Sequence, residues 1–232
     1  MLATRNAHKV AELRRILMPY VDGVELLGLD ELPDIAEVAE TGATFADNAL
    51  LKARAVAEQT GLVAVADDSG LAVDALNGMP GVLSARWSGM HGDDDGNLRL
   101  VLAQLRDVLD DRRGAAFVCA AAAVAPDGRE VVATGRLEGV LTHAARGSGG
   151  FGYDPIFQPV GEQRTTAELS AGDKDAISHR GLAFRALGPL LRELLLLPPA
   201  RHAQQDSREQ SDAGEQLGHD NAPVRDRANP TN

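Results

Sequence analysis

The chain has 232 residues, 44% of them hydrophobic, and a formal net charge of -11. This length allows one sizeable core or two small lobes, and the acidic balance excludes a general nucleic-acid binder, which needs Lys and Arg to displace counterions from phosphates. No segment reaches the roughly 18 apolar residues of a membrane span. Cys119 is the only cysteine, which excludes an internal disulfide. We therefore expect a cytoplasmic protein with no membrane partner.

Short apolar runs alternate with helical patterns along residues 1–197, which predicts an α/β domain. Apolar residues recur at helical spacing from Val10 to Leu17, and they predict a first helix over residues 6–20.

The next elements are predicted by a cap and by two apolar patterns. Thr44 and Asp47 resemble a capping box, which predicts a second helix from Thr44 to just before Gly61. The run LVAVA (62–66) predicts a buried strand, and the spacing of leucines in residues 97–109 predicts a third helix.

Two long apolar runs flank the sequence Pro-Asp-Gly at 126–128, which predicts a β-hairpin and, with the other strands, a mixed sheet. Residues 175–197 show the pattern of a last helix. Residues 198–232 contain almost no large apolar side chains, so burial cannot offset their ordering entropy. We expect them to form a disordered tail.

The stretch GSGGFGYDP (147–155) spells the dinucleotide fingerprint G-x-G-x-x-G, but its context is wrong. That site needs a helix directly after the glycines, whereas Pro155 disfavours helical geometry at the preceding residue. Four glycines in six residues still make a loop that a ligand can approach closely. A glycine-rich surface loop without a ligand is the alternative.

Polar residues also gather in TRNAHK (4–9), where a strand is expected to become a helix. Free N–H groups and the helix dipole favour an anion there, and Lys9 is close enough to reach it. The alternative is that Thr4 or Asn6 only caps the helix and Lys9 is solvated.

Two adjacent carboxylates, Asp67 and Asp68, close the apolar strand in AVADDSG (64–70). Side chains alternate along a strand, so only one of the two is expected to face a given ligand while the other braces the loop. Buried carboxylates need a partner such as a metal, a Lys or N–H groups. The alternative is a turn with Asx capping.

Three further features of the sequence are weaker indications of a functional site. An isolated glutamate such as Glu40 is usually solvated. The sequence KDAISHRG (174–181) places cations near the start of the last helix, which is unfavourable unless a ligand compensates. The sequence HGDDDGN (91–97) lacks the ligand pattern of a calcium loop, so we interpret it as a solvated acidic turn without function.

Five of these stretches in order, LATRNAHK, ETGATFADNALLKA, ADDSGL, GGFGYDPIF and ISHRG, resemble the inosine triphosphate pyrophosphatase family over residues 2–197. That family hydrolyses the unusual purine nucleoside triphosphates dITP, ITP and XTP to the monophosphate and pyrophosphate. The resemblance implies a mixed α/β fold, with an elongated central sheet flanked by helices and a nucleotide cleft between two lobes. It also implies a homodimer and dependence on Mg²⁺.

The resemblance also assigns roles to individual residues. Glu40 and Asp68 would bind Mg²⁺, Asp68 would be the general base, and Asp67 would support it. The triphosphate would be held by Thr4, Arg5, Asn6, Ala7, His8 and Lys9, with Lys9 as the principal cation. Substrate would also be contacted by Ser69 and by a purine pocket of Phe151, Gly152, Tyr153, Asp154, Lys174, Ser178, His179 and Arg180.

Two features depart from the family pattern besides the polar tail. Arg5 stands where the family often has a small residue, so it adds a phosphate contact or crowds the loop. Met1 stands directly before LAT, which leaves almost no room for the first strand that members usually carry. Either the true start lies further upstream or the strand is short, and either would loosen the phosphate site that follows.

Two other functions compete with hydrolysis. A catalytically silent sensor that binds purine nucleotides would use the same cleft. An aspartyl-phosphate phosphatase needs Asp-x-Asp after a strand, whereas Asp67 and Asp68 are adjacent.

Overall fold

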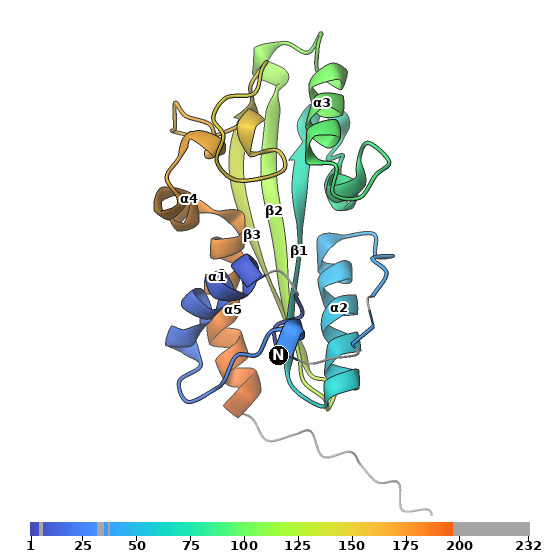
Figure 1. Ribbon diagram of the computed structural model, residues 1–232, viewed down its shortest axis with the longest axis vertical. Coiled ribbons are helices and arrows are strands. Elements are labelled where there is room, and N and C mark those ends of the chain that lie inside the picture. The colour runs from blue at the N-terminus through green and yellow to red at the C-terminus, as the bar shows by residue number, and fades with distance from the viewer. Residues whose placement is uncertain (5–6, 32–34, 37, 197–232) are drawn as a thin grey trace, which may run out of the picture. The chain divides into compact units, whose positions relative to one another are not determined.

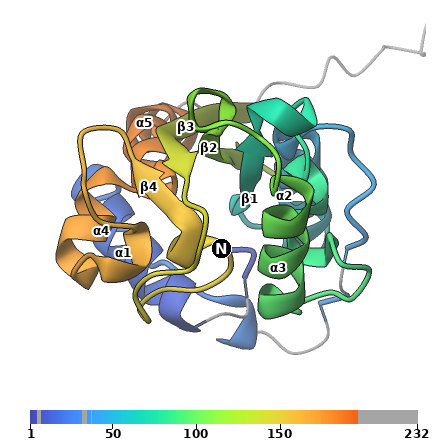
Figure 2. The ribbon, with the colours of Figure 1, turned by 90° about the horizontal axis from the view of Figure 1, so that it is seen from above.

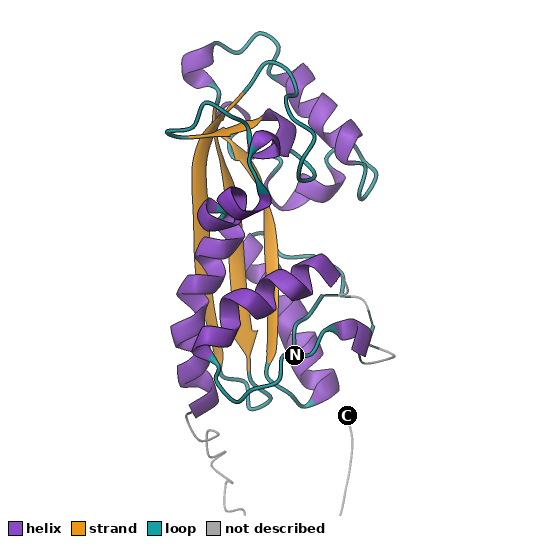
Figure 3. Ribbon diagram, turned by 60° about the vertical axis from the view of Figure 1, so that its left-hand side comes forward, coloured by secondary structure: helices purple, strands orange, loops and turns teal. Residues whose placement is uncertain are grey.

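The computed structural model describes residues 1–4, 7–31, 35–36 and 38–196. Its sheet has four strands in the order β1-β2-β3-β4, and each strand is antiparallel to its neighbour. The strands are β1 (Ala64–Val73), β2 (Gly114–Val124), β3 (Glu130–Leu141) and β4 (Phe157–Pro159). The first three run side by side along most of their length (Figure 3). The predicted tail (198–232) lies outside the described residues.

The chain's first residues add a short parallel element. Leu2 forms isolated parallel bridges to Gly28 and to Val65 of β1, which makes the pairing mixed, as predicted. The Met1 amino group donates a hydrogen bond to the Val63 carbonyl at 2.7 Å. Among the described residues, this first element is the isolated bridging residue Leu2 and not a strand.

Within the described ranges, five α-helices flank the sheet: α1 (Ala7–Leu17), α2 (Phe45–Thr60), α3 (Asp94–Gln104), α4 (Ala171–Ile177) and α5 (His179–Leu196). Single 3₁₀ turns cover Met18–Tyr20, Leu29–Glu31, Asp74–Leu76, Asp110–Arg112, Asp154–Ile156 and Thr166–Glu168, and a longer 3₁₀ helix covers Gly81–Arg86. Seen from above, the sheet lies between α1 and α5 on one side and α2 on the other (Figure 2). The helices α2 and α3 lie beside opposite ends of β1 (Figure 1). No helix in the described part of the chain is long and apolar enough to cross a membrane.

Local signals correctly predict α2 and the hairpin. Thr44 caps α2 by accepting a hydrogen bond from the Asp47 N–H, and the Asp47 side chain accepts one from the Thr44 N–H in return. Gly61 ends the helix with a φ of 65°. In the turn between β2 and β3, Gly128 has a φ of 85°, a conformation that glycine tolerates.

Three predicted boundaries are wrong, each for a physical reason. The strand β1 continues past Asp67 and Asp68 to Val73, because it pairs with β2 along its whole length. The helix α3 begins at Asp94, because the Asp93 side chain accepts the Gly96 N–H as a cap, and it ends at Gln104. The predicted last helix is two helices.

Ser178 separates α4 from α5. Its backbone is extended, with φ of -61° and ψ of 142°. Its hydroxyl accepts the Gly181 N–H at 2.9 Å, as an N-cap does at the start of a new helix. This cap places His179 and Arg180 in the first turn of α5.

Alternating residues of β1 and β2 build separate cores on the two faces of the sheet. Val65 and Cys119 pack with α1 and α5, whereas Ala66 and Ala120 pack with α2. Cys119 is a free cysteine buried in the first of these cores. A third core, which includes Val101 of α3, lies around the other end of these strands.

We predict that Gly135 sets the distance between β3 and α5. A Cβ atom there would overlap the carbonyl oxygen of His179 and the amide nitrogen of Ala183. Replacement Gly135→Ala should push α5 from the sheet and lower the free energy of unfolding by about 1–3 kcal/mol in urea denaturation.

The control is Thr134→Ala, because Thr134 is exposed on the same strand. It should change the free energy of unfolding by less than about 0.5 kcal/mol. Equal stability of the two variants would contradict close packing of α5 on β3.

Candidate functional site

Asp67 and Asp68 lie in the middle of β1, and their side chains have partners on opposite faces of the sheet. Asp67 Oδ2 accepts a hydrogen bond from Arg180 Nε of α5 at 3.2 Å. Asp68 Oδ2 accepts one from Asn48 Nδ2 of α2 at 2.9 Å. The predicted alternation is confirmed, and the alternative of an Asx-capped turn is wrong.

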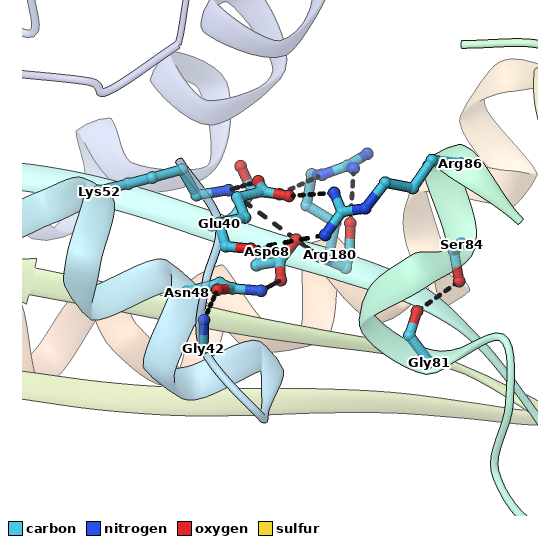
Figure 4. Close-up of polar contacts among 11 residues, drawn as sticks. Glu40, Gly42, Asn48, Lys52, Asp68, Gly81, Ser84, Arg86 and Arg180 are labelled. Carbon is cyan, nitrogen blue, oxygen red and sulfur yellow. Dashed lines mark hydrogen bonds and ion pairs between the residues drawn. The ribbon is translucent and has the colours of Figure 1, made fainter. Parts of the chain in front are cut away.

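Glu40, in the loop before α2, lies near Asp68 (Figure 4). Lys52 Nζ lies 2.7 Å from Glu40 Oε1 and 3.8 Å from Asp68 Oδ1, so one ammonium group lies between two carboxylates. Arg86 Nη1 adds a second cation, 3.7 Å from Glu40 Oε2. We name Glu40, Asn48, Lys52, Asp68 and Arg86 the acid–lysine cluster. Glu40 is therefore a paired residue and not an isolated surface charge.

Burial has the largest effect on the pKa of Asp68. It raises the pKa of Asp68, while the charge of Lys52 and the hydrogen bond from Asn48 oppose that rise. Glu40 and Asp67 raise the pKa further, because like charges disfavour the ionised form. The ionised form of Asp68 is thus stabilised by any cation held close to it.

The cluster also contains the residues that could hold a metal ion. In the part of the chain that the structure describes, no group of three or more His, Cys, Asp or Glu side chains could do so. However, Mg²⁺ is commonly held by one or two carboxylates plus substrate phosphates. Glu40 and Asp68 fit this requirement, because both already face one positive group, the Lys52 ammonium.

A cavity of about 540 Å³ lies between β1, the start of α5 and the glycine-rich loop. Its volume is in the range of small-molecule sites, about 300–1,000 Å³. Nine residues to which the resemblance assigns substrate contacts line it: Ser69, Phe151, Gly152, Tyr153, Asp154, Lys174, Ser178, His179 and Arg180. The structure therefore brings this predicted group together.

The side chain of Asp154 holds the conformation of the glycine-rich loop. Its buried carboxylate accepts hydrogen bonds from the Phe151 N–H and the Thr166 hydroxyl, both at 2.8 Å, and it pairs with Lys174. A Cβ atom at Gly150, where φ is 72°, would overlap this carboxylate. The loop is followed by a 3₁₀ turn and not by an α-helix, which confirms that it is no dinucleotide fingerprint.

The first turn of α5 connects the cavity to β1. Besides binding Asp67, Arg180 donates from Nη2 to the Ser69 hydroxyl at 3.1 Å. The imidazole of His179 stacks on Phe117 of β2, with ring centroids 5.0 Å apart and an angle of 17° between the planes. Both α5 side chains are thus held by the sheet.

The predicted triphosphate segment can be placed only in part. Arg5 and Asn6 lie outside the described residues, as do the side chains of Ala7, His8 and Lys9. The helix α1 begins at Ala7, so the predicted helix N-terminus is present. The phosphate contacts of residues 4–9 stay predictions.

Sequence analysis assigned no role to several residues that make contacts in the two groups, among them Asn48, Lys52, Arg86 and Thr166. Asn48 and Lys52 are four residues apart in α2 and share one helix face, a spacing that could have identified them. The sequence carried no comparable signal for Arg86 or Thr166.

We predict that removal of the Asp67 charge destabilises the fold. Asp67→Asn leaves the buried Arg180 guanidinium without this carboxylate, which should cost about 3 kcal/mol in the free energy of unfolding. Thermal and urea unfolding measure the loss.

Glu138→Gln is the matched control, because it breaks the exposed ion pair between Arg136 and Glu138. Its cost should stay below about 1 kcal/mol. If both variants were equally stable, the buried pair would not support the fold as described.

The fold and these motifs match known proteins. Residues 1–190 match the Ham1 family. Over 195 residues, the chain is 63% identical to the dITP/XTP pyrophosphatase of Streptomyces coelicolor, covering 84% of this chain and 98% of that protein. It is 56% identical to the dITP/XTP pyrophosphatase of Mycobacterium tuberculosis, covering 84% and 95%.

Solved structures show the same likeness. The crystal structure of the dITP/XTP pyrophosphatase from Mycobacterium abscessus is 60% identical with a TM-score of 0.70, covering 82% of this chain and 97% of that one. A HAM1 protein from Coxiella burnetii is 41% identical with a TM-score of 0.76, covering 83% and 97%. These matches confirm the resemblance drawn from the five motifs, and the chain belongs to the Ham1 family.

Proposed function

We propose that this chain hydrolyses dITP, ITP and XTP to the nucleoside monophosphate and pyrophosphate. The observation that carries the proposal is the adjacency of two sites on β1. Ser69 lines the cavity, and its neighbour Asp68 belongs to the acid–lysine cluster. This arrangement suits a purine in the cavity and its phosphates at the cluster. The names of the Streptomyces and Mycobacterium relatives support the same activity.

In the proposed reaction, the bond between the α-phosphorus and the oxygen bridging to the β-phosphate breaks, and a water oxygen takes its place. Asp68 orients this water and accepts its proton. The ammonium of Lys52 and the guanidinium of Arg86 stabilise negative charge on the phosphates. Lys9 completes the phosphate site from α1.

Glu40 and Asp68 would hold Mg²⁺. When bound, the metal acidifies water and neutralises charge on the phosphoryl oxygens. Asp67 supports this chemistry through Arg180, because their ion pair fixes both the strand and the start of α5. We also propose that the chain acts as a homodimer in the cytoplasm, as the resemblance implies.

A silent nucleotide sensor would need the cavity but not the paired carboxylates beside it. The acid–lysine cluster therefore supports hydrolysis over the sensor. The three relatives above that are named dITP/XTP pyrophosphatases, from Streptomyces and Mycobacterium species, point the same way.

Incubation with Mg²⁺ and dITP should yield equal amounts of dIMP and pyrophosphate, measured by ion-exchange chromatography. Asp68→Asn should abolish turnover and leave the melting temperature close to wild type, because it removes the proton acceptor while keeping the shape. Asp107→Asn alters an exposed carboxylate outside both sites and should retain full activity. Release of orthophosphate and dIDP would contradict the proposed bond cleavage.

The base should be selected by hydrogen-bond donors. Lys174 and Arg180 can donate to the keto oxygen of hypoxanthine or xanthine, whereas the amino group of adenine is itself a donor and would leave them unmatched. We expect kcat/KM for dITP to exceed that for dATP by at least about 100-fold. Comparable values for the two nucleotides would contradict this assignment.

A further inference from the structure

The acidic turn over residues 91–97, in which the sequence indicated no function, reaches the rim of the cavity. Asp94 Oδ2 accepts a hydrogen bond from the Gly152 N–H at 2.9 Å. Asp94 opens α3 and Gly152 belongs to the glycine-rich loop, so this bond joins segments 58 residues apart. Both residues line the cavity.

The three aspartates of this turn have different partners. Asp93 caps α3 by accepting the Gly96 N–H at 3.0 Å. Asp95 pairs with Arg99 one turn along the same helix. Asp94 reaches across to the loop, and its charge is also favoured by the dipole at the start of α3.

Hydrogen bonds hold the loop at three successive residues. The Phe151 N–H donates to Asp154, the Gly152 N–H to Asp94, and the Tyr153 hydroxyl to the Ser84 carbonyl at 2.9 Å. Burial raises the pKa of Tyr153, so this hydroxyl keeps its proton. Phe151 is 61% exposed as a residue, and Lys174 Nζ lies 5.1 Å from the centroid of its ring.

An exposed ring loses rotational freedom when a ligand stacks on it, which weakens binding unless the backbone already holds it in place. Two of these bonds leave the loop: the one from Gly152 to Asp94 of α3 and the one from Tyr153 to Ser84 in the 3₁₀ helix Gly81–Arg86. The bond to Asp94 holds the amide of Gly152 itself, whose φ of 61° is the conformation that glycine adopts most readily, next to Phe151.

We propose that Asp94 is a positioning residue, whose hydrogen bond to the Gly152 N–H fixes Phe151 at the rim of the cavity for contact with a purine. The inference rests on the proposed function, because that function places the base beside Phe151. Asp94 belongs to the cavity and not to the acid–lysine cluster, so it should affect nucleotide binding more than the chemical step.

The test is the steady-state hydrolysis of dITP by the full chain and three variants. Asp94→Ala removes the acceptor and should raise KM about fivefold, the effect of one hydrogen bond, with kcat close to wild type. Asp94→Asn keeps an acceptor oxygen without the charge and should restore KM. Asp95→Ala is the matched control for a lost carboxylate in the first turn of α3, and it should leave KM unchanged.

Three results would overturn the inference alone: equal KM for Asp94→Ala and Asp95→Ala, failure of Asp94→Asn to restore KM, or a fall in kcat at unchanged KM. In each of them the wild-type chain still hydrolyses dITP. A wild-type chain that does not hydrolyse dITP would instead overturn the proposed function, and this inference with it.

Discussion

Two adjacent carboxylates in the middle of a buried strand are the constraint on which this structure depends. Asp67 and Asp68 are only 7% and 9% exposed, so each charge needs a polar partner on its own face of the sheet. Arg180 of α5 supplies one partner, and Asn48 and Lys52 of α2 supply the other. The two helices on opposite faces are thereby tied to one point of β1.

Because the two carboxylates face opposite sides of the sheet, β1 separates a cavity suited to a base from a cluster suited to a metal and phosphates. On one face, Arg180 and Ser69 belong to a cavity with planar and donor groups suited to a base. On the other, Lys52 lies between carboxylates suited to a metal and phosphates. One strand can therefore hold the two ends of a nucleotide at a fixed distance. The glycine-rich loop lies beside the cavity suited to the base. Asp154 accepts a hydrogen bond from the Phe151 N–H of this loop, and Asp94 of α3 accepts one from the Gly152 N–H.

The sequence predicted what depends on local signals. The caps at Thr44 and Gly61 located α2, and alternation placed Asp67 and Asp68 on opposite faces. It could not show that β1 continues through both aspartates, because that follows from pairing with β2 about 50 residues later in the chain. The contact of Asp94 with the loop is equally non-local. Most of the substrate residues came from the family resemblance and not from the physics of any single motif.

The central claim is that a nucleotide lies across β1, with its base in the cavity and its phosphates at the acid–lysine cluster. A crystal structure of Asp68→Asn with dITP and Mg²⁺ tests it most directly. The account predicts electron density for the purine next to Phe151 and Lys174, and for the phosphates within contact of Lys52. Density for the purine at Lys52, or for the nucleotide outside the cavity, would contradict it.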